Sequence, residues 1–303
     1  MKKRIAILGI GGVGGYVGGH LAKKYARTNE FEVVFFARGE HGNKIKENGL
    51  QIYLDNQLEV VYPDIVTDDL ENVPSIDYLI CATKSYDLIE SVTRLKNAIS
   101  DKTVILPLLN GVDSYEKLKT LFPSSKVLNG CIFIVSKIKE PGAIEITGLN
   151  HYVCVGSKEL SPIHVVDLVE LFGKAGINVR LSEDIDRAVW EKYIFISSLA
   201  TLSTLKNKTI GQILEDDGLK NTLIELMKEV KSVATAKGIK ITESYLEKNI
   251  SAMEKMPYAT TSSMHRDQLA GKPIEIDSLT KYVIKLGNQL NVETKTFYKT
   301  LNS

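Results

Sequence analysis

Apolar residues in the first half of the chain gather in short runs rich in β-branched and aromatic side chains. Six such runs, separated by helical or irregular stretches, cover residues 4–8, 32–37, 78–82, 103–109, 126–135 and 151–155. Short β-rich runs that alternate with helical stretches are typical of an α/β domain with a mostly parallel sheet. We therefore expect each run to be a strand of such a sheet.

Two segments between the second and third of these runs alternate apolar with polar residues. They cover residues 50–54 and 58–62 and flank Asp55 and Asn56. Period-two alternation is typical of a strand with one buried face, and aspartate and asparagine favour turns. The pattern predicts a hairpin inserted into the α/β domain, and we expect another strand pair over residues 145–156 at the far edge of the sheet.

Helical periodicity replaces the β-rich runs beyond Ser182. The clearest helical segments cover residues 184–206, 219–236 and 274–290. Ser182 is a suitable N-cap for the first of them, because Glu183 and Asp184 place acidic residues in its first turn. These patterns predict two domains, an α/β domain over residues 1–182 and an all-α domain over residues 183–303.

Composition supports two domains and disfavours polyanionic partners. The chain has 303 residues, 44% of them hydrophobic, which is enough for two buried cores. Because 38 lysines and arginines nearly balance 37 aspartates and glutamates, the net charge favours neither nucleic acid nor an anionic membrane. A small molecule is the expected partner. The apolar runs are too short for a signal peptide or a membrane span, so we expect a cytoplasmic protein.

The cysteines and histidines show no spacing typical of redox or metal sites. Cys81, Cys131 and Cys154 lie in or beside apolar runs without a CxxC pair, and we interpret them as reduced, buried thiols. The five histidines are not spaced with cysteines or carboxylates as metal ligands are. The sequence therefore predicts no metal site.

A glycine-rich segment follows the first predicted strand. Its residues are Gly9, Ile10, Gly11, Gly12, Val13 and Gly14, and residues 16–24 after it can form a helix. A GxGxxG segment between a strand and a helix is the fingerprint of dinucleotide binding. Gly9 permits the tight turn, Gly11 leaves room for the pyrophosphate, and Gly14 lets the helix approach the strand. A flexible turn without a ligand is the alternative interpretation.

Three polar residues follow later strands of the predicted sheet, namely Arg38, Lys84 and Asn110. Ligands of open α/β sheets bind at the carboxyl ends of strands, so these side chains can reach a cofactor or a substrate. Arg38 favours NADPH over NADH, because a guanidinium binds the 2′-phosphate that a carboxylate would repel. An ordinary surface arginine near Glu40, a solvated loop lysine and an Asn-Gly turn are the alternatives.

The order and spacing of several motifs resemble the ketopantoate reductase (2-dehydropantoate 2-reductase) family along essentially the whole chain. The matching residues are Gly9, Gly11 and Gly14, Ala37-Arg38, Thr83-Lys84, Leu109-Asn110-Gly111, Trp190-Glu191-Lys192, Ser262-Ser263-Met264 with Asp267, and Glu275-Ile276-Asp277. The resemblance implies a Rossmann domain and a helical domain related to that of phosphogluconate dehydrogenase. It also implies reduction of ketopantoate to pantoate by NADPH, on the route to coenzyme A.

The resemblance further implies roles for individual residues. The glycine segment, Arg38 and Lys84 match cofactor-binding positions, and Asn110 matches a position shared by cofactor and substrate. Lys192 matches the catalytic acid. Ser263 and Glu275 match substrate-binding positions, and we count Glu275 among the catalytic residues as well.

The surroundings of Lys192 in the sequence make chemical sense of that role. Residues 184–206 are apolar nearly all round, so we expect a buried helix. Burial of an ammonium without a partner lowers its pKa, which suits proton donation near neutral pH, whereas a lysine that extends to the surface is the alternative. Ser263 with nearby amides could bind a carboxylate. Glu275 could accept a hydrogen bond from a substrate hydroxyl, although a glutamate there also suits the helix dipole.

The chain departs from the family pattern on the predicted lysine helix. Asparagines follow the catalytic lysine at four and eight residues in the family, whereas Ile196 and Ala200 stand at these positions here. We expect a more apolar pocket, in which branched 2-keto acids such as ketoisovalerate compete with ketopantoate. Glu275 opposes this effect, because it could still bind the hydroxyl of ketopantoate.

Three other functions are open at this point. A reductase of a different 2-keto acid fits the same motifs. A β-hydroxyacid dehydrogenase would carry its lysine in a GxxGxGxxxK segment, which the chain lacks. A non-catalytic NADPH sensor would need the glycine segment and Arg38 but not Lys192. In each case we expect a monomer or a homodimer.

Overall fold

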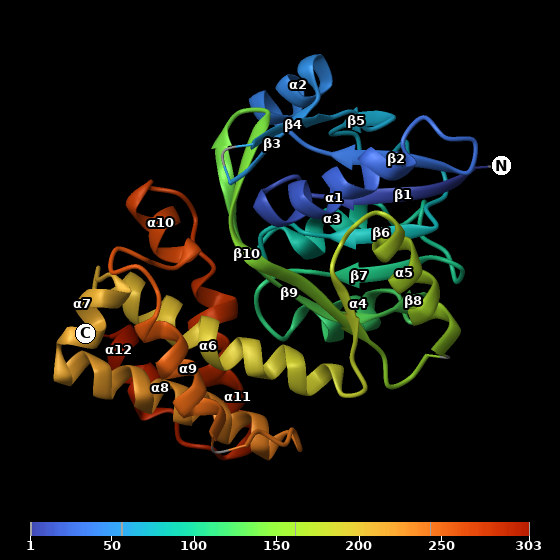
Figure 1. The fold of residues 1–303 in the computed structure, drawn as a ribbon. Helices are drawn as coiled ribbons and strands as arrows, with labels where there is room; N and C mark the ends of the chain where they lie inside the picture. The colour runs from blue at the N-terminus through green and yellow to red at the C-terminus, as the bar shows by residue number, and fades with distance from the viewer. Residues whose placement is uncertain (1, 56, 161, 243, 303) are drawn as a thin grey trace. The chain divides into compact units, whose positions relative to one another are not determined.

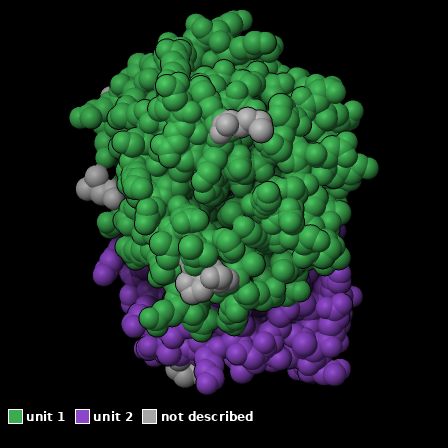
Figure 2. Space-filling model, turned by 90° about the vertical axis from the view of Figure 1, so that its right-hand side faces the viewer, with its two compact units in different colours: residues 1–109, 113–185 green, residues 110–112, 186–303 purple. Residues whose placement is uncertain are grey.

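The computed structural model describes residues 2–55, 57–160, 162–242 and 244–302. The chain divides into two compact units (Figure 2). Unit 1 comprises residues 1–109 and 113–185, and unit 2 comprises residues 110–112 and 186–303. The short segment Asn110–Val112 thus clusters with the second unit although it belongs to the first half of the sequence.

Unit 1 is built on a parallel six-stranded sheet, as expected (Figure 1). Its strands are β1 (Lys3–Leu8), β2 (Phe31–Phe36), β5 (Ile65–Thr67), β6 (Tyr78–Cys81), β7 (Val104–Pro107) and β8 (Lys126–Val127). Their order in space is β5-β2-β1-β6-β7-β8, which is the strand order of doubly wound dinucleotide-binding domains. The sequence pattern missed β5, because three residues are too few to display a period.

A second sheet lies beside the first within unit 1. It contains β3 (Leu50–Leu54), β4 (Gln57–Val61), β9 (Asn129–Glu140), β10 (Ala143–Gly156) and β11 (Val179–Leu181). The predicted hairpin is confirmed, because β3 and β4 pair antiparallel from Leu50 opposite Val61 to Leu54 opposite Gln57. Asn56 of its turn lies outside the described residues.

Two strand predictions need correction. The run over residues 126–135 is not one strand, because β8 belongs to the first sheet and β9 to the second. Residues 145–156 are not a strand pair but most of the single strand β10, which pairs with β9 along one side. Ile144 and Ile146 before a register shift between Thr147 and Tyr152, and Val153 and Val155 after it, all lie in the core.

Helices cover both faces of the parallel sheet. Their bounds are α1 (Gly12–Tyr25), α2 (Gly39–Asn48), α3 (Leu88–Arg94), α4 (Ser114–Leu121) and α5 (Pro162–Lys174). One core joins α1, α5 and the second sheet to one face of the parallel sheet. The other face packs against α3 and α4. Helix α1 therefore lies between the two sheets.

Unit 2 is all-helical, as predicted. Its helices are α6 (Ile185–Leu205), α7 (Ile210–Glu215), α8 (Asp217–Ala236), α9 (Ser244–Glu254), α10 (Ser263–Leu269), the π-helical turn η1 (Asp277–Lys281), α11 (Tyr282–Leu290) and α12 (Lys295–Leu301). Most of the side chains of α6 are buried in the core of this unit. Ser182 is not the N-cap of α6, because the helix begins three residues later and the Ser182 amide donates to the carbonyl of Val155.

Candidate active site

The glycine segment of unit 1 forms a tight turn between β1 and α1. Gly9 has a φ of +91°, and a Cβ on it would lie 2.9 Å from the amide nitrogen of Thr83. A Cβ on Gly14 would overlap the carbonyl oxygen of Gly9, whereas a Cβ on Gly11 would meet no atom within 4 Å. The turn is therefore closed at Gly9 and Gly14 and open at Gly11.

Helix α1 begins at Gly12, earlier than the expected start at residue 16. Its N-cap residue, Gly11, provides no side chain to cap the first turn. The free amides of an uncapped helix start, together with the helix dipole, favour an anion. Open space at Gly11 beside these amides fits the pyrophosphate of a dinucleotide.

Arg38, a predicted cofactor residue, pairs with an aspartate on the loop after β6 that also carries Lys84. Arg38 follows β2, and its Nη2 lies 2.6 Å from Oδ2 of Asp87. The Asp87 amide donates to the carbonyl of Lys84 at 3.0 Å, so the loops after β2 and β6 meet here. The Arg38 side chain is 79% exposed, and such an ion pair contributes at most about 1 kcal/mol. The guanidinium can therefore turn to a phosphate.

Sequence reasoning missed Asp87 and His41 near this turn. His41 lies in α2, three residues after Arg38, and its Nδ1 accepts the amide of Gly142 at 3.0 Å. Burial lowers the pKa of His41, which the nearby backbone of Ile10 partly offsets. The neutral imidazole thus ties α2 to the turn before β10, next to the glycine segment. Only the short spacing from Arg38 could have pointed to it.

The predicted catalytic lysine meets a predicted substrate residue in unit 2. Nζ of Lys192, on α6, donates to Oδ1 of Asn110 at 3.0 Å. Gly111 after Asn110 has a φ of +109°, which turns the chain sharply at this point. Contrary to expectation, Lys192 is half-buried and its ammonium has a partner. Residues 82 positions apart in sequence are thus brought into contact.

Aromatic packing fixes the turn of α6 that carries Lys192. Trp190 and Tyr193 are buried and contact each other edge to face, with ring centroids 5.6 Å apart. The Tyr193 hydroxyl donates to the carbonyl of Ser278 at 2.7 Å, which anchors η1 to α6. Glu275 lies just before η1, three residues ahead of Ser278, and is only 3% exposed. The structure therefore places Glu275 on a segment held against the lysine helix.

Ser263, the predicted carboxylate ligand, is the first residue of α10 and is half-buried. Its neighbour Ser262 caps the helix by accepting the amide of His265 at 3.1 Å. The Ser262 hydroxyl also bonds to that of Ser203 on α6 at 2.9 Å. Nε2 of His265 lies 2.8 Å from Oδ1 of Asn207, and burial lowers the pKa of this histidine. The Ser263 backbone is thus firmly attached to α6.

The face of α6 that carries Lys192 is mostly apolar. Ile196 follows one turn later and is half-buried, whereas Ala200 is fully buried. The next hydroxyl along this face is Ser203, which is also fully buried and bonded to Ser262. The half-buried residues within one turn of Lys192 on this face, Ile196 among them, are therefore apolar.

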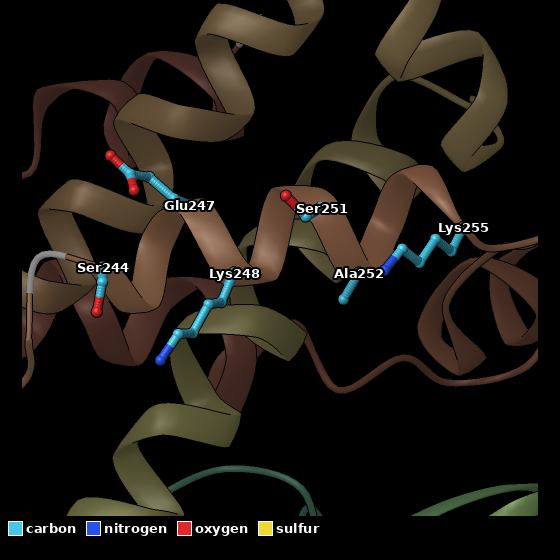
Figure 3. Close-up of a pocket in the computed structure, with 6 residues that line it drawn as sticks. All are labelled: Ser244, Glu247, Lys248, Ser251, Ala252 and Lys255. Atoms are coloured by element: carbon cyan, nitrogen blue, oxygen red, sulfur yellow. The ribbon is translucent and has the colours of Figure 1, made fainter.

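A hollow on α9 does not belong to this site (Figure 3). Its lining residues are Ser244, Glu247, Lys248, Ser251, Ala252 and Lys255. In Figure 3, Glu247 and Ser251 point to one side of the helix and Lys248 points to the other. Side chains that diverge from a single helix cannot surround a small substrate.

The described part of the chain offers neither a metal site nor a membrane span. No three histidine, cysteine, aspartate or glutamate side chains within it cluster as metal ligands. None of its helices is long and apolar enough to cross a bilayer.

Comparison with known proteins identifies the family. Residues 5–159 match the family described as "Ketopantoate reductase PanE/ApbA", and residues 184–302 match "Ketopantoate reductase PanE/ApbA C terminal". The chain belongs to the ketopantoate reductase family. The resemblance seen in the sequence is thereby confirmed, as is the fold class. The chain is an oxidoreductase of this family, which uses a nicotinamide cofactor.

Individual relatives span nearly the whole chain. The Bacillus subtilis protein named "Uncharacterized oxidoreductase YkpB" is 29% identical over 292 residues, or 95% of this chain and 93% of the relative. The crystal structure of 2-dehydropantoate 2-reductase from Porphyromonas gingivalis is 30% identical with a TM-score of 0.84, and the match covers 99% of this chain and 98% of that chain.

A more distant structure extends the likeness in fold. The ternary structure of D-mandelate dehydrogenase with NADH and anilino(oxo)acetate has a TM-score of 0.86 at 21% identity, and the match covers 98% of this chain and 96% of that chain. At this identity the likeness concerns the fold alone. Family membership therefore leaves the substrate of the present chain to be inferred from its own residues.

Gly11, where a Cβ has room, and Gly14, where a Cβ does not, provide a matched pair of variants. Gly11→Ala should leave the thermal unfolding temperature unchanged and weaken NADPH binding at least about tenfold, because its methyl group occupies the space expected for the pyrophosphate. Gly14→Ala should be destabilised by about 1–3 kcal/mol, because its methyl group overlaps Gly9. Calorimetry and a fluorescence titration with NADPH measure both effects. Unchanged NADPH affinity in Gly11→Ala would contradict phosphate binding at the turn.

Proposed function

We propose that this protein reduces a small 2-keto acid with NADPH, with ketopantoate as the first candidate substrate and pantoate as the product. The observation that carries the proposal is the half-buried Lys192, whose ammonium is held by Asn110 at 3.0 Å. A solvated surface lysine would not need such a partner. Family membership supplies the reaction class, and the residues below supply the roles.

The residues of unit 1 fit the cofactor. The amides at the start of α1 would hold the pyrophosphate, and Arg38 would hold the 2′-phosphate of NADPH. Lys84 lies on the same loop as Asp87 and is the second cation at the carboxyl edge of the sheet. When bound, NADPH supplies the hydride that reduces the carbonyl carbon of the substrate.

The residues of unit 2 supply the proton and the anchors. Lys192 donates a proton to the carbonyl oxygen, and Asn110 orients the ammonium before the substrate arrives. Ser263 binds the carboxylate of the keto acid, and Glu275 accepts a hydrogen bond from the hydroxyl of ketopantoate. Glu275 thus contacts the substrate, while Lys192 acts on the reacting oxygen.

A second substrate class has its own support. Ile196 presents an apolar, half-buried side chain one turn from Lys192, where the family carries an asparagine. A substrate hydroxyl that faces isoleucine loses a partner at a cost of about 1–3 kcal/mol. Apolar branched 2-keto acids such as ketoisovalerate avoid this cost and are the alternative substrates.

Oxidation of NADPH measured against a panel of 2-keto acids tests the proposed activity. We expect turnover of ketopantoate, of branched apolar keto acids, or of both. Absence of turnover with every member of a panel that includes these compounds, in protein shown to bind NADPH, would favour a non-catalytic sensor.

Removal of the proton donor should separate chemistry from cofactor binding. Lys192→Ala should lower kcat by about a hundredfold or more, because general acid catalysis contributes on that order, while the Kd for NADPH stays within about twofold. Lys281→Ala is the matched control, since Lys281 is an exposed lysine of unit 2 paired with Asp277. Stopped-flow kinetics and NADPH titration measure both quantities. Lys192→Ala activity within threefold of the parent would assign the proton to another group.

Cofactor choice should depend on Arg38. Arg38→Ala should weaken NADPH binding by about 1.5–3 kcal/mol, because a charged contact to the 2′-phosphate is lost, and should leave NADH binding nearly unchanged. Arg27→Ala is the control, since Arg27 is an exposed arginine of the same unit that stacks on Tyr62. Calorimetric titration with both nucleotides decides the matter. Equal losses for NADPH and NADH would mean that Arg38 does not bind the phosphate.

Substrate preference should respond to Ile196. We expect the parent to use ketoisovalerate with kcat/KM within about a hundredfold of ketopantoate, because a missing hydrogen bond costs about 1–3 kcal/mol. Ile196→Asn should shift the ratio towards ketopantoate, whereas Ile196→Val should not. Ala200 is left unchanged, since an asparagine at this fully buried position would overpack the core. A parent preference for ketopantoate of a thousandfold or more would mean that Glu275 alone satisfies the hydroxyl.

A further inference from the structure

Strands β9 and β10 place two of the three cysteines opposite each other. Cys131 and Cys154 are direct partners in the antiparallel register, so their side chains leave the sheet on the same face. Directly opposite residues have Cα atoms about 4.5–5.5 Å apart, which lies within the range that a disulfide spans. Neither cysteine forms a disulfide, and they are 2% and 9% exposed, respectively. The pair can therefore be joined without movement of the strands.

The two thiols interact with each other. A hydrogen bond with Cys131, and to a smaller extent the nearby charge of Arg180, lowers the pKa of Cys154 below that of an ordinary thiol, although its burial acts in the opposite direction. The thiolate, which is the reactive form, is therefore easier to form at Cys154 than at an unperturbed cysteine. Burial raises the pKa of the third cysteine, Cys81, to about 12. Cys81 is thus an inert thiol in the same unit.

Arg180 is held in place beside the cysteine pair. It is the register partner of Cys154 on β11, and its guanidinium lies 3.6 Å from the centroid of the Tyr152 ring. Tyr152 in turn stacks on Phe133, with centroids 4.7 Å apart. Arg180 is itself exposed, and its register position beside Cys154 puts the positive charge on the same face of the sheet as the more exposed of the two thiols.

We propose that Cys131 and Cys154 form a redox-active dithiol that hydrogen peroxide converts into a disulfide across β9 and β10. The Cys154 thiolate attacks one peroxide oxygen, the O–O bond breaks, and a sulfenic acid and hydroxide form. The Cys131 sulfur then attacks the sulfenic sulfur, the S–O bond breaks, and water leaves after protonation. Two thiols are oxidised and one peroxide is reduced to two waters. A dithiol reductant reverses the change.

Thiol counting and peptide mapping of the full chain test the proposal. After mild treatment with peroxide at pH 7.5, we expect two of the three thiols to disappear and a cross-linked peptide pair containing Cys131 and Cys154 to form. Dithiothreitol should restore all three thiols. Cys131→Ser should stop at a sulfenic acid on Cys154, which a cyclic 1,3-dione traps, and Cys154→Ser should give neither product. These readouts are independent of the proposed enzyme activity.

A pair of arginine variants tests the cause of the reactivity. Arg180→Gln should slow disulfide formation severalfold, because the thiolate of Cys154 loses a nearby positive charge. Arg27→Gln is the matched control, since Arg27 also stacks on a tyrosine, Tyr62. In this variant the disulfide should form at the parent rate. Retention of all three thiols, or loss of Cys81 as fast as the pair, would overturn the proposal even if a cysteine variant failed to fold.

Discussion

Unit 1 depends on the close approach of helix α1 to two sheets at once. A Cβ at Gly14 or Gly18 would collide with the turn after β1 or with β2, and a Cβ at Gly15 or Gly19 would collide with β10 or β3. Residues four apart share a side of a helix, so Gly14 and Gly18 lie on one side of α1, and Gly15 and Gly19 lie on the neighbouring side. Interiors are packed so densely that one added methyl group would separate the layers. The run of glycines therefore sets the spacing of the whole α/β unit.

The same requirement positions the glycine turn that we propose as the cofactor site. Because α1 lies directly on the parallel sheet, its first turn is held against the end of β6, where Gly9 approaches Thr83. The uncapped amides are then fixed in space before any ligand binds, so little ordering remains to oppose phosphate binding. His41 adds a second tie, since it joins α2 to the turn before β10. The fold and the proposed phosphate site are thus two consequences of one glycine-rich helix.

Local patterns predicted the elements well and their long-range partners poorly. The parallel strands, the hairpin and helix α6 follow from periods of two and 3.6 residues, and the glycine segment follows from its place after a strand. The division of residues 126–135 between two sheets does not follow from the local pattern. A period of two shows which face of a strand is buried, but it does not show to which sheet the strand belongs. Asp87 and His41 were missed for a similar reason. Their partners, Arg38 and Gly142, lie 49 and 101 residues away.

The contact between Asn110 and Lys192 shows how such a distant pair changes the chemistry inferred from a pattern. The apolar sequence of α6 alone predicted an ammonium without a partner. Lys192 is instead half-buried, and its ammonium donates a hydrogen bond to the side-chain oxygen of Asn110, so the proton donor that we propose is held in place by a partner. Ile196 one turn further on adds no polar group, so in the proposed reaction the ammonium is the polar contact that this part of α6 offers to a substrate. On that proposal, selectivity for further polar groups has to come from other segments, of which the one carrying the buried Glu275 is anchored to α6 through Tyr193.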